Sequence, residues 1–195
     1  MLKLNKKILN QNKNIYTLFP KDKKELIKMI HDEIIERGNE CSLNHIDVSN
    51  IKDMSCLFSS FYYNGVSNFN GDISEWDVSN VENMSSMFQN CDFDGDLSKW
   101  DVSNVEDMSY MFYDSKFSGE NGSINNWNIS NVSGMVGLFE RSFFKSDISN
   151  WEISKFVLKS KFFLSKRFLF FIILKSINFS NPSQSISKCS KDKLP

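Results

Sequence analysis

A single recurring phrase constrains the fold of this chain more than any other feature. The stretch WDVSNVENMSSMF at 76–88 returns as WDVSNVEDMSYMF at 100–112 and, less closely, as WNISNVSGMVGLF at 127–139. An earlier copy without the tryptophan, IDVSNIKDMSCLF, spans 46–58, and a fifth begins at Trp151 and then fades. A unit this short cannot bury its apolar face alone, so neighbouring copies must stack on one another.

Each copy has two halves with different spacing. In the first half Trp76 and Val78 alternate with Glu75 and Asp77, which is the two-residue period of a strand. Apolar residues then recur every three or four positions over 81–88, which indicates a short helical segment. We therefore predict strands near 46–48, 76–78, 100–102, 127–129 and 151–153. Glycines in the turns FNGD and FDGD are expected at positions of positive φ.

The full spacing, apolar-x-x-apolar-x-apolar-x-Asn, has the shape of a leucine-rich repeat. It predicts an α/β fold, a leucine-rich-repeat-like right-handed solenoid with parallel strands on one face and short helical segments on the other. Asparagines in one template position are expected to bond the backbone of adjacent turns, although each could also be a simple turn residue. This predicted structural ladder contains Asn50, Asn80, Asn104 and Asn131.

The chain divides into three predicted parts, of which only the middle one repeats. Residues 1–40 form a basic N-terminus with a capping helix at 22–37, where Asp22 is the expected N-cap and Gly38 the stop. Residues 41–154 hold about five repeats, the last incomplete. Residues 155–195 are a divergent basic tail, expected to be disordered, a divergent cap, or a truncated or frame-shifted end.

Charge is separated along the chain, and this bears on the partner. Residues 41–154 carry 17 acidic and five basic side chains, whereas 155–195 carry nine basic and one acidic. The acidic repeats argue against nucleic acid as a ligand. No apolar run reaches the length of a membrane span, and the N-terminus shows no clear signal peptide or lipoprotein cysteine. The cysteines and histidines form no metal motif, so we predict no metal, no cofactor and no catalytic residue.

Polar residues of the predicted strands that point away from the core would share one exposed face. Repeat proteins use such a surface to bind extended partners, although single residues in it more often serve solubility alone. We call this set the predicted face. It comprises His45, Asp47, Glu75, Asp77, Lys99, Asp101, Asn126, Asn128, Asn150 and Glu152. A weaker alternative is a calcium-binding or hydrolytic site in the acidic turn at 92–96, where Asp92, Asp94 and Asp96 lie.

The run NGDISEWDVSNVENMSSMFQNC and the preceding segment KDKKELIKMIHDEIIERGNE resemble the BspA-type leucine-rich-repeat family of bacterial surface proteins, whose units are called surface-lipoprotein repeats. The resemblance covers about residues 21–154. It implies a non-catalytic solenoid, displayed at the cell surface, that adheres to a protein or host-surface ligand, and we expect a monomer. The alternative is a degenerate fragment of a longer repeat protein without independent function.

Overall fold

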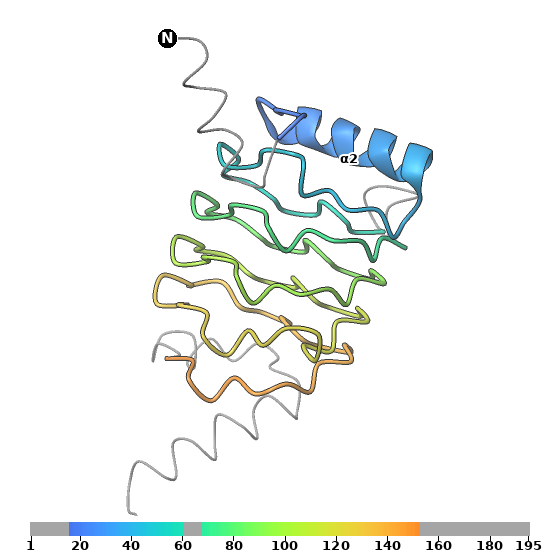
Figure 1. Ribbon diagram of the computed structural model, residues 1–195. Helices are drawn as coiled ribbons and strands as arrows, with labels where there is room; N and C mark the ends of the chain where they lie inside the picture. The colour runs from blue at the N-terminus through green and yellow to red at the C-terminus, as the bar shows by residue number, and fades with distance from the viewer. Residues whose placement is uncertain (1–15, 61–67, 153–195) are drawn as a thin grey trace, which may run out of the picture.

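A computed structural model describes residues 16–60 and 68–152 of the 195-residue chain. In it, a helix lies across one end of a series of stacked coils, and the chain descends through them one coil at a time (Figure 1). The helix is α2 (Lys23–Arg37), and the described residues contain no other α-helix. The predicted tail at 155–195 lies outside the described residues.

Helix α2 follows from local signals in the sequence. The carboxylate of Asp22 accepts the N–H of Glu25 at 2.9 Å, which satisfies one of the free donors of the first turn. At the other end Gly38 has φ of 87°, and its N–H donates to the carbonyl of Ile34 at 2.8 Å. Leu26, Ile30 and Ile34 are buried on one side of the helix. The helix predicted at 22–37 is therefore confirmed.

The coils are held together by backbone hydrogen bonds between neighbouring copies of the repeat. The N–H of Met84 donates to the carbonyl of Asp107, and the N–H of Phe88 to that of Met111, both at 2.9 Å. Two residues earlier in each coil the bonds run the opposite way in sequence, since the N–H of Glu106 donates to the carbonyl of Glu82 at 2.8 Å. Every inner coil is thus bonded to the one before it and the one after it, which keeps equivalent residues in register.

The predicted class is wrong in its secondary structure. The described residues contain one helix and no sheet, and parallel pairing is limited to isolated bridges rather than strands. These bridges join Leu18 to Ile46, Asp53 to Asn83, Asn83 to Asp107, and Asp107 to Gly134. The chain is therefore not a solenoid with a parallel strand face and a helical face, and residue 153 of the fifth predicted strand lies outside the described part.

Tight turns explain why the spacing was misleading. The N–H of Val81 donates to the carbonyl of Val78 at 2.9 Å, and that of Met87 to Met84 at 3.2 Å. A turn at each corner returns the chain to the interior after three residues, which produces the same apolar spacing as a short helix. The segment predicted as helical is instead part of the region that bonds to the next coil.

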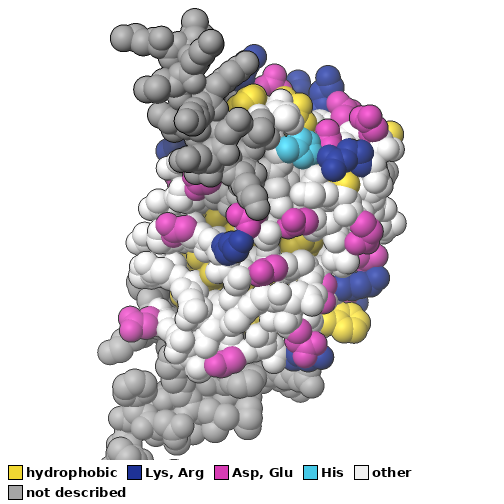
Figure 2. Space-filling view, viewed as in Figure 1, with side chains coloured by type: hydrophobic (Ala, Val, Ile, Leu, Met, Phe, Trp, Pro, Cys, Tyr) yellow, Lys and Arg dark blue, Asp and Glu magenta, His cyan; other side chains and the backbone are white. Residues whose placement is uncertain are grey.

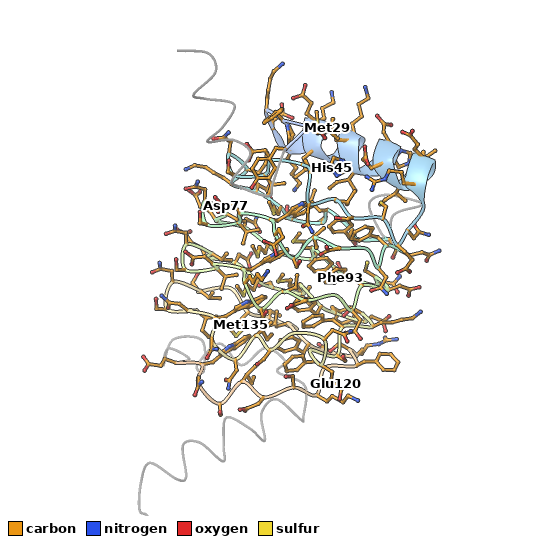
Figure 3. All side chains as sticks on the ribbon, viewed as in Figure 1. Met29, His45, Asp77, Phe93, Glu120 and Met135 are labelled. Atoms are coloured by element: carbon orange, nitrogen blue, oxygen red, sulfur yellow. The ribbon has the colours of Figure 1, made fainter. Side chains whose placement is uncertain are left out.

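Stacked aromatic rings fill the interior (Figure 3). The rings of Phe58, Phe88 and Phe112 lie 5.4 and 5.5 Å apart between successive coils and are nearly parallel. A second column runs beside it, and its member Phe93 lies 4.5 Å from Phe88 within the same coil. These phenylalanines are almost completely buried, so each coil covers the apolar surface of the next.

Gly71 shows a different reason for glycine than the one the sequence suggested. Neither Gly71 nor Gly95 has positive φ. A Cβ atom on Gly71 would come within 1.9 Å of the carbonyl oxygen of Cys41. The glycine of the FNGD turn is needed because two backbones approach closely there.

Candidate functional site

The residues of the predicted face are accessible to solvent, but the first of them, His45, already contacts helix α2. His45 is half-buried beneath α2, and its Nε2 lies 3.1 Å from the carboxylate of Glu33 on that helix. Figure 3 shows His45 close to α2 and Asp77 further along the stack. Asn126, Asn150 and Glu152 are exposed. Of the ten residues, His45 belongs to the contact between α2 and the first coil.

Four members of the predicted face form one row of turn residues. The carboxylates of Asp47, Asp77 and Asp101 each accept the N–H of the serine two positions later, at 3.0 to 3.1 Å. Asn128 accepts the N–H of Ser130 in the same way at 3.1 Å. Hydrogen bonds from Ser103 lower the pKa of Asp101. These side chains therefore close local turns, whatever else they do.

Glu75 and Lys99 are brought together from successive coils. Their side chains form an exposed ion pair, and the hydrogen bond from Lys99 to Glu75 raises the pKa of the lysine. Exposed pairs of this kind contribute little to stability. Their significance is that residues 24 positions apart meet because the coils are in register.

The asparagine ladder joins each coil to the one before it. The amide nitrogen of Asn80 donates to the carbonyl of Ser49 at 2.9 Å, and that of Asn104 to Ser79 at 2.7 Å. Asn131 donates to the carbonyl of Ser103 at 2.6 Å. For Asn50, in the first coil, the described part of the structure shows no such bond.

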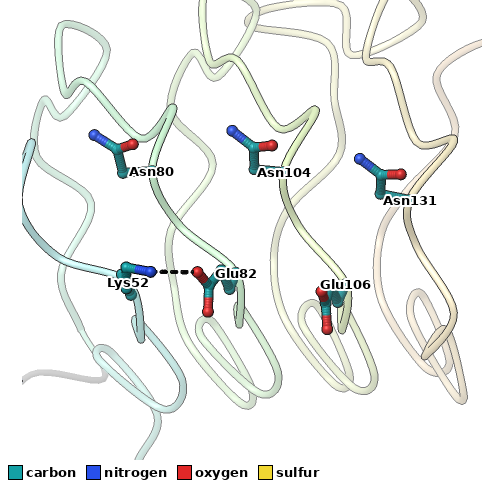
Figure 4. Close-up of a pocket in the computed structure, with 6 residues that line it drawn as sticks. All are labelled: Lys52, Asn80, Glu82, Asn104, Glu106 and Asn131. Carbon is teal, nitrogen blue, oxygen red and sulfur yellow. Dashed lines mark hydrogen bonds and ion pairs between the residues drawn. The ribbon is translucent and has the colours of Figure 1, made fainter.

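Beside this ladder the structure contains an open groove that the sequence did not predict (Figure 4). Its volume is about 420 Å³. We call it the asparagine groove. It is lined by Lys52, Asn80, Glu82, Asn104, Glu106 and Asn131. A signal was present, because the residue two positions after each ladder asparagine is Lys52, Glu82, Glu106 or Ser133.

One ion pair lies in this groove. Nζ of Lys52 donates to the carboxylate of Glu82 at 2.7 Å across one coil boundary, and this bond raises the pKa of the lysine. The side chain of Glu106, one coil further on, is exposed. Among the described residues it has no ion-pair partner.

Over the visible face of the coils as a whole, Asp and Glu side chains are scattered, while Lys and Arg gather mostly near α2 (Figure 2).

The acidic turn at 92–96 directs its three carboxylates to separate partners. Asp92 pairs with Lys116 at 2.8 Å, and Asp96 accepts the N–H of Ser98 at 2.8 Å. Asp94 accepts the N–H and hydroxyl of Ser118 at 2.7 and 2.9 Å. Within residues 16–60 and 68–152 no cluster of three or more His, Cys, Asp or Glu side chains could hold a metal ion.

Four tryptophans of the repeat form hydrogen bonds between coils. The indole N–H of Trp76 donates to the carbonyl of Leu43 at 2.9 Å, and that of Trp100 to Ile73 at 3.1 Å. Trp127 and Trp151 repeat the contact at 3.1 and 2.9 Å. The rings of Trp76 and Trp100 stack 6.4 Å apart. This row fixes the same register that aligns the groove.

In the part of the chain that the structure describes, no helix is both long and apolar enough to cross a bilayer.

Comparisons with known proteins identify the family. Neither the curated proteins nor the solved structures include a match to this chain. Residues 25–139 match a family described as "Mycoplasma protein of unknown function, DUF285", and residues 115–189 match it again. This match does not point specifically to the BspA-type family. The chain belongs to the DUF285 family of Mycoplasma proteins of unknown function.

Proposed function

We propose that this chain is a non-catalytic repeat protein that binds another protein through the exposed polar rows of its coils. The observation that carries the proposal is the register between coils. Because each inner coil is bonded to both neighbours, side chains in equivalent positions line up as rows along the stack, as Glu75 and Lys99 do. Repeat proteins bind extended partners on surfaces of this kind.

The rows are held in place before any partner arrives. Asp77 and Asp101 are fixed by their turn hydrogen bonds, and Asn104 by its bond to the previous coil. A surface whose side chains are already ordered loses less conformational entropy on binding. This arrangement favours recognition by many weak, regularly spaced polar contacts rather than by one deep pocket.

More specifically, we propose that the chain adheres, at a cell surface, to a protein or host-surface ligand. It is supported by the resemblance of the repeats to the BspA-type surface proteins. Antibody labelling of intact cells that produce the full gene product tests it. Labelling only after the cells are opened would contradict surface display and would leave protein binding unaffected.

Binding to polypeptide is tested by titrating the purified chain into fluorescent peptide libraries grouped as basic, neutral or acidic. We expect saturable binding of one group, with the peptides intact by mass spectrometry afterwards. Absence of binding by every group would contradict the proposal. Cleavage of a peptide, lost in the variants Asp94→Asn or Asp96→Asn, would make the protein an enzyme instead.

A further inference from the structure

We infer that the asparagine groove binds an extended polypeptide segment rich in Lys or Arg. This inference rests on the proposed function and names the place and the chemistry of the partner. The groove contains residues of four successive coils, from Lys52 in the first to Asn131 in the fourth (Figure 4). It therefore follows the stack and suits a linear ligand.

The hydrogen-bonding groups of the groove are unbalanced. Asn80, Asn104 and Asn131 each use the amide nitrogen to bond the preceding coil, which leaves the amide oxygen as the group that can accept a bond from a ligand. The two glutamates add only acceptors. The donors of the lining are the second N–H of each asparagine amide and the ammonium group of Lys52, which is already bonded to Glu82. Acceptor sites therefore outnumber donors, and the lining favours a ligand that brings donors.

The charges of the groove select among ligands that carry donors. Glu82 is compensated by Lys52, whereas Glu106 has no ion-pair partner among the described residues, so the lining carries one net negative charge. The repeats around it hold 17 acidic and five basic residues over 41–154, which attracts cations over a longer range. A nucleic acid would be repelled.

An extended peptide supplies both kinds of donor that the lining needs. Its backbone N–H groups recur regularly along an extended chain and can reach asparagine oxygens of successive coils. Its Lys or Arg side chains can reach Glu106 and compete with Lys52 for Glu82. A free polyamine offers the charge without the backbone donors.

The test uses the full chain and a fluorescent peptide of alternating Lys and Ser, with binding followed by anisotropy. Glu106→Gln should weaken binding about threefold, because a single exposed charge pair is worth that order of affinity. Lys52→Gln should tighten binding by a similar factor, because it releases Glu82 for the ligand. A residue that merely supported the fold would weaken binding when changed, so the opposite sign for Lys52 is the decisive readout.

Matched variants on the predicted face, the other row of side chains that could bind the peptide, provide the comparison. Asp77→Asn and Asp101→Asn remove charge but keep the turn acceptor, as Asn128 does in the same position. We expect a smaller change than for Glu106→Gln. The inference is overturned if the peptide binds and these two variants weaken it while Glu106→Gln does not, or if Lys52→Gln fails to tighten binding.

Two further probes separate this inference from the proposed function. If acidic or neutral peptides bind and the Lys-Ser peptide does not, the groove assignment is wrong but the chain remains a binding module. If spermine binds as tightly as the peptide and responds to the same variants, the site recognises cations rather than polypeptide. Weakening of the peptide complex by added salt is expected, because exposed charges are screened over about 8–10 Å.

Discussion

Helix α2 and the coils beneath it are stabilised by contacts of very different range. Both ends of α2 are capped by hydrogen bonds between residues close in sequence. The N–H of Glu25 donates to the carboxylate of Asp22, and the N–H of Gly38 donates to the carbonyl of Ile34. A coil is instead held by hydrogen bonds to neighbouring coils, such as the one from the indole N–H of Trp100 to the carbonyl of Ile73, 27 residues away. The caps of the helix are made by its own residues together with Asp22 and Gly38, whereas a coil depends on the coils beside it.

The place where the two regions meet shows what the helix adds. Lys23 reaches Asp53 of the first coil at 3.1 Å, and Glu33 reaches His45 at the same distance. Leu26 and Ile30 are part of the same apolar cluster as the coil residues. α2 thus covers the apolar end of the first coil, which would otherwise face water.

The largest expected effect comes from breaking a contact between inner coils. Trp100 is buried, stacks on Trp76 and donates to the carbonyl of Ile73. Trp100→Ala removes all three interactions and should cost about 3–5 kcal/mol of unfolding free energy, measured by denaturant titration. A loss below about 1 kcal/mol would mean that the coils do not depend on this row.

A matched variant separates the hydrogen bond from the packing. Trp100→Phe keeps an aromatic ring in the stack but leaves the carbonyl of Ile73 without its indole donor. We expect a loss of about 0.5–1.5 kcal/mol, smaller than for alanine, because one hydrogen bond is lost while the carbonyl of Ile73 still accepts the backbone N–H of Trp76. Equal losses for the two variants would show that the ring contributes nothing beyond its hydrogen bond.

The same contrast in range explains what the sequence could and could not predict. The boundaries of α2 were readable because Asp22 and Gly38 act within one turn. The repeat was readable too, and with it the shared positions of the tryptophans and asparagines. The secondary structure of the coils was not, because the spacing of Met84, Met87 and Phe88 fits a helix as well as a turn.

The asparagine groove was missed for a related reason. Its lining depends on which residues of different copies meet, and this is set by the backbone bonds between coils. Asn80 and Glu82 are close in sequence, but Lys52 and Glu82 lie 30 positions apart and meet only because neighbouring coils are in register. Reading each copy separately placed Glu82 on a helical side that does not exist.

Weakening the helix should produce a smaller and more local change than Trp100→Ala. Asp22→Ala removes the side-chain acceptor for Glu25 and should cost about 1 kcal/mol, while Asp22→Asn retains an acceptor and should cost only a few tenths. Hydrogen exchange should show faster opening confined to α2 and the adjacent first coil. Equal acceleration in the coil that contains Trp127 would contradict the separation between the two regions.

A single rung of the asparagine ladder should matter less again. Asn104→Ala loses the bond to Ser79, and because this site is exposed, water replaces part of it, so about 0.5–1 kcal/mol is expected. Asn50→Ala is the matched control in the first coil and should change the unfolding free energy by less. If the two variants cost the same, the ladder bond makes no separate contribution.

The smallest expected effect has the opposite sign and concerns backbone strain in the coils. Cys56, Ser86, Tyr110 and Gly137 occupy one position of the repeat, and all four have φ between 56° and 62°. The left-handed region costs a non-glycine residue about 1–2 kcal/mol, and a glycine avoids this cost. Part of the gain, about 0.5–1 kcal/mol, is offset because a chain with glycine has more conformational freedom when unfolded. Ser86→Gly should therefore stabilise the protein by about 0.5–1 kcal/mol in denaturant unfolding. Ser98→Gly, at an exposed serine without positive φ, should instead destabilise it by a similar amount. If both glycines lowered stability equally, the strain at this repeated position would not be real, and the fourth coil would carry Gly137 only to make room for the ring of Tyr110 that lies over it.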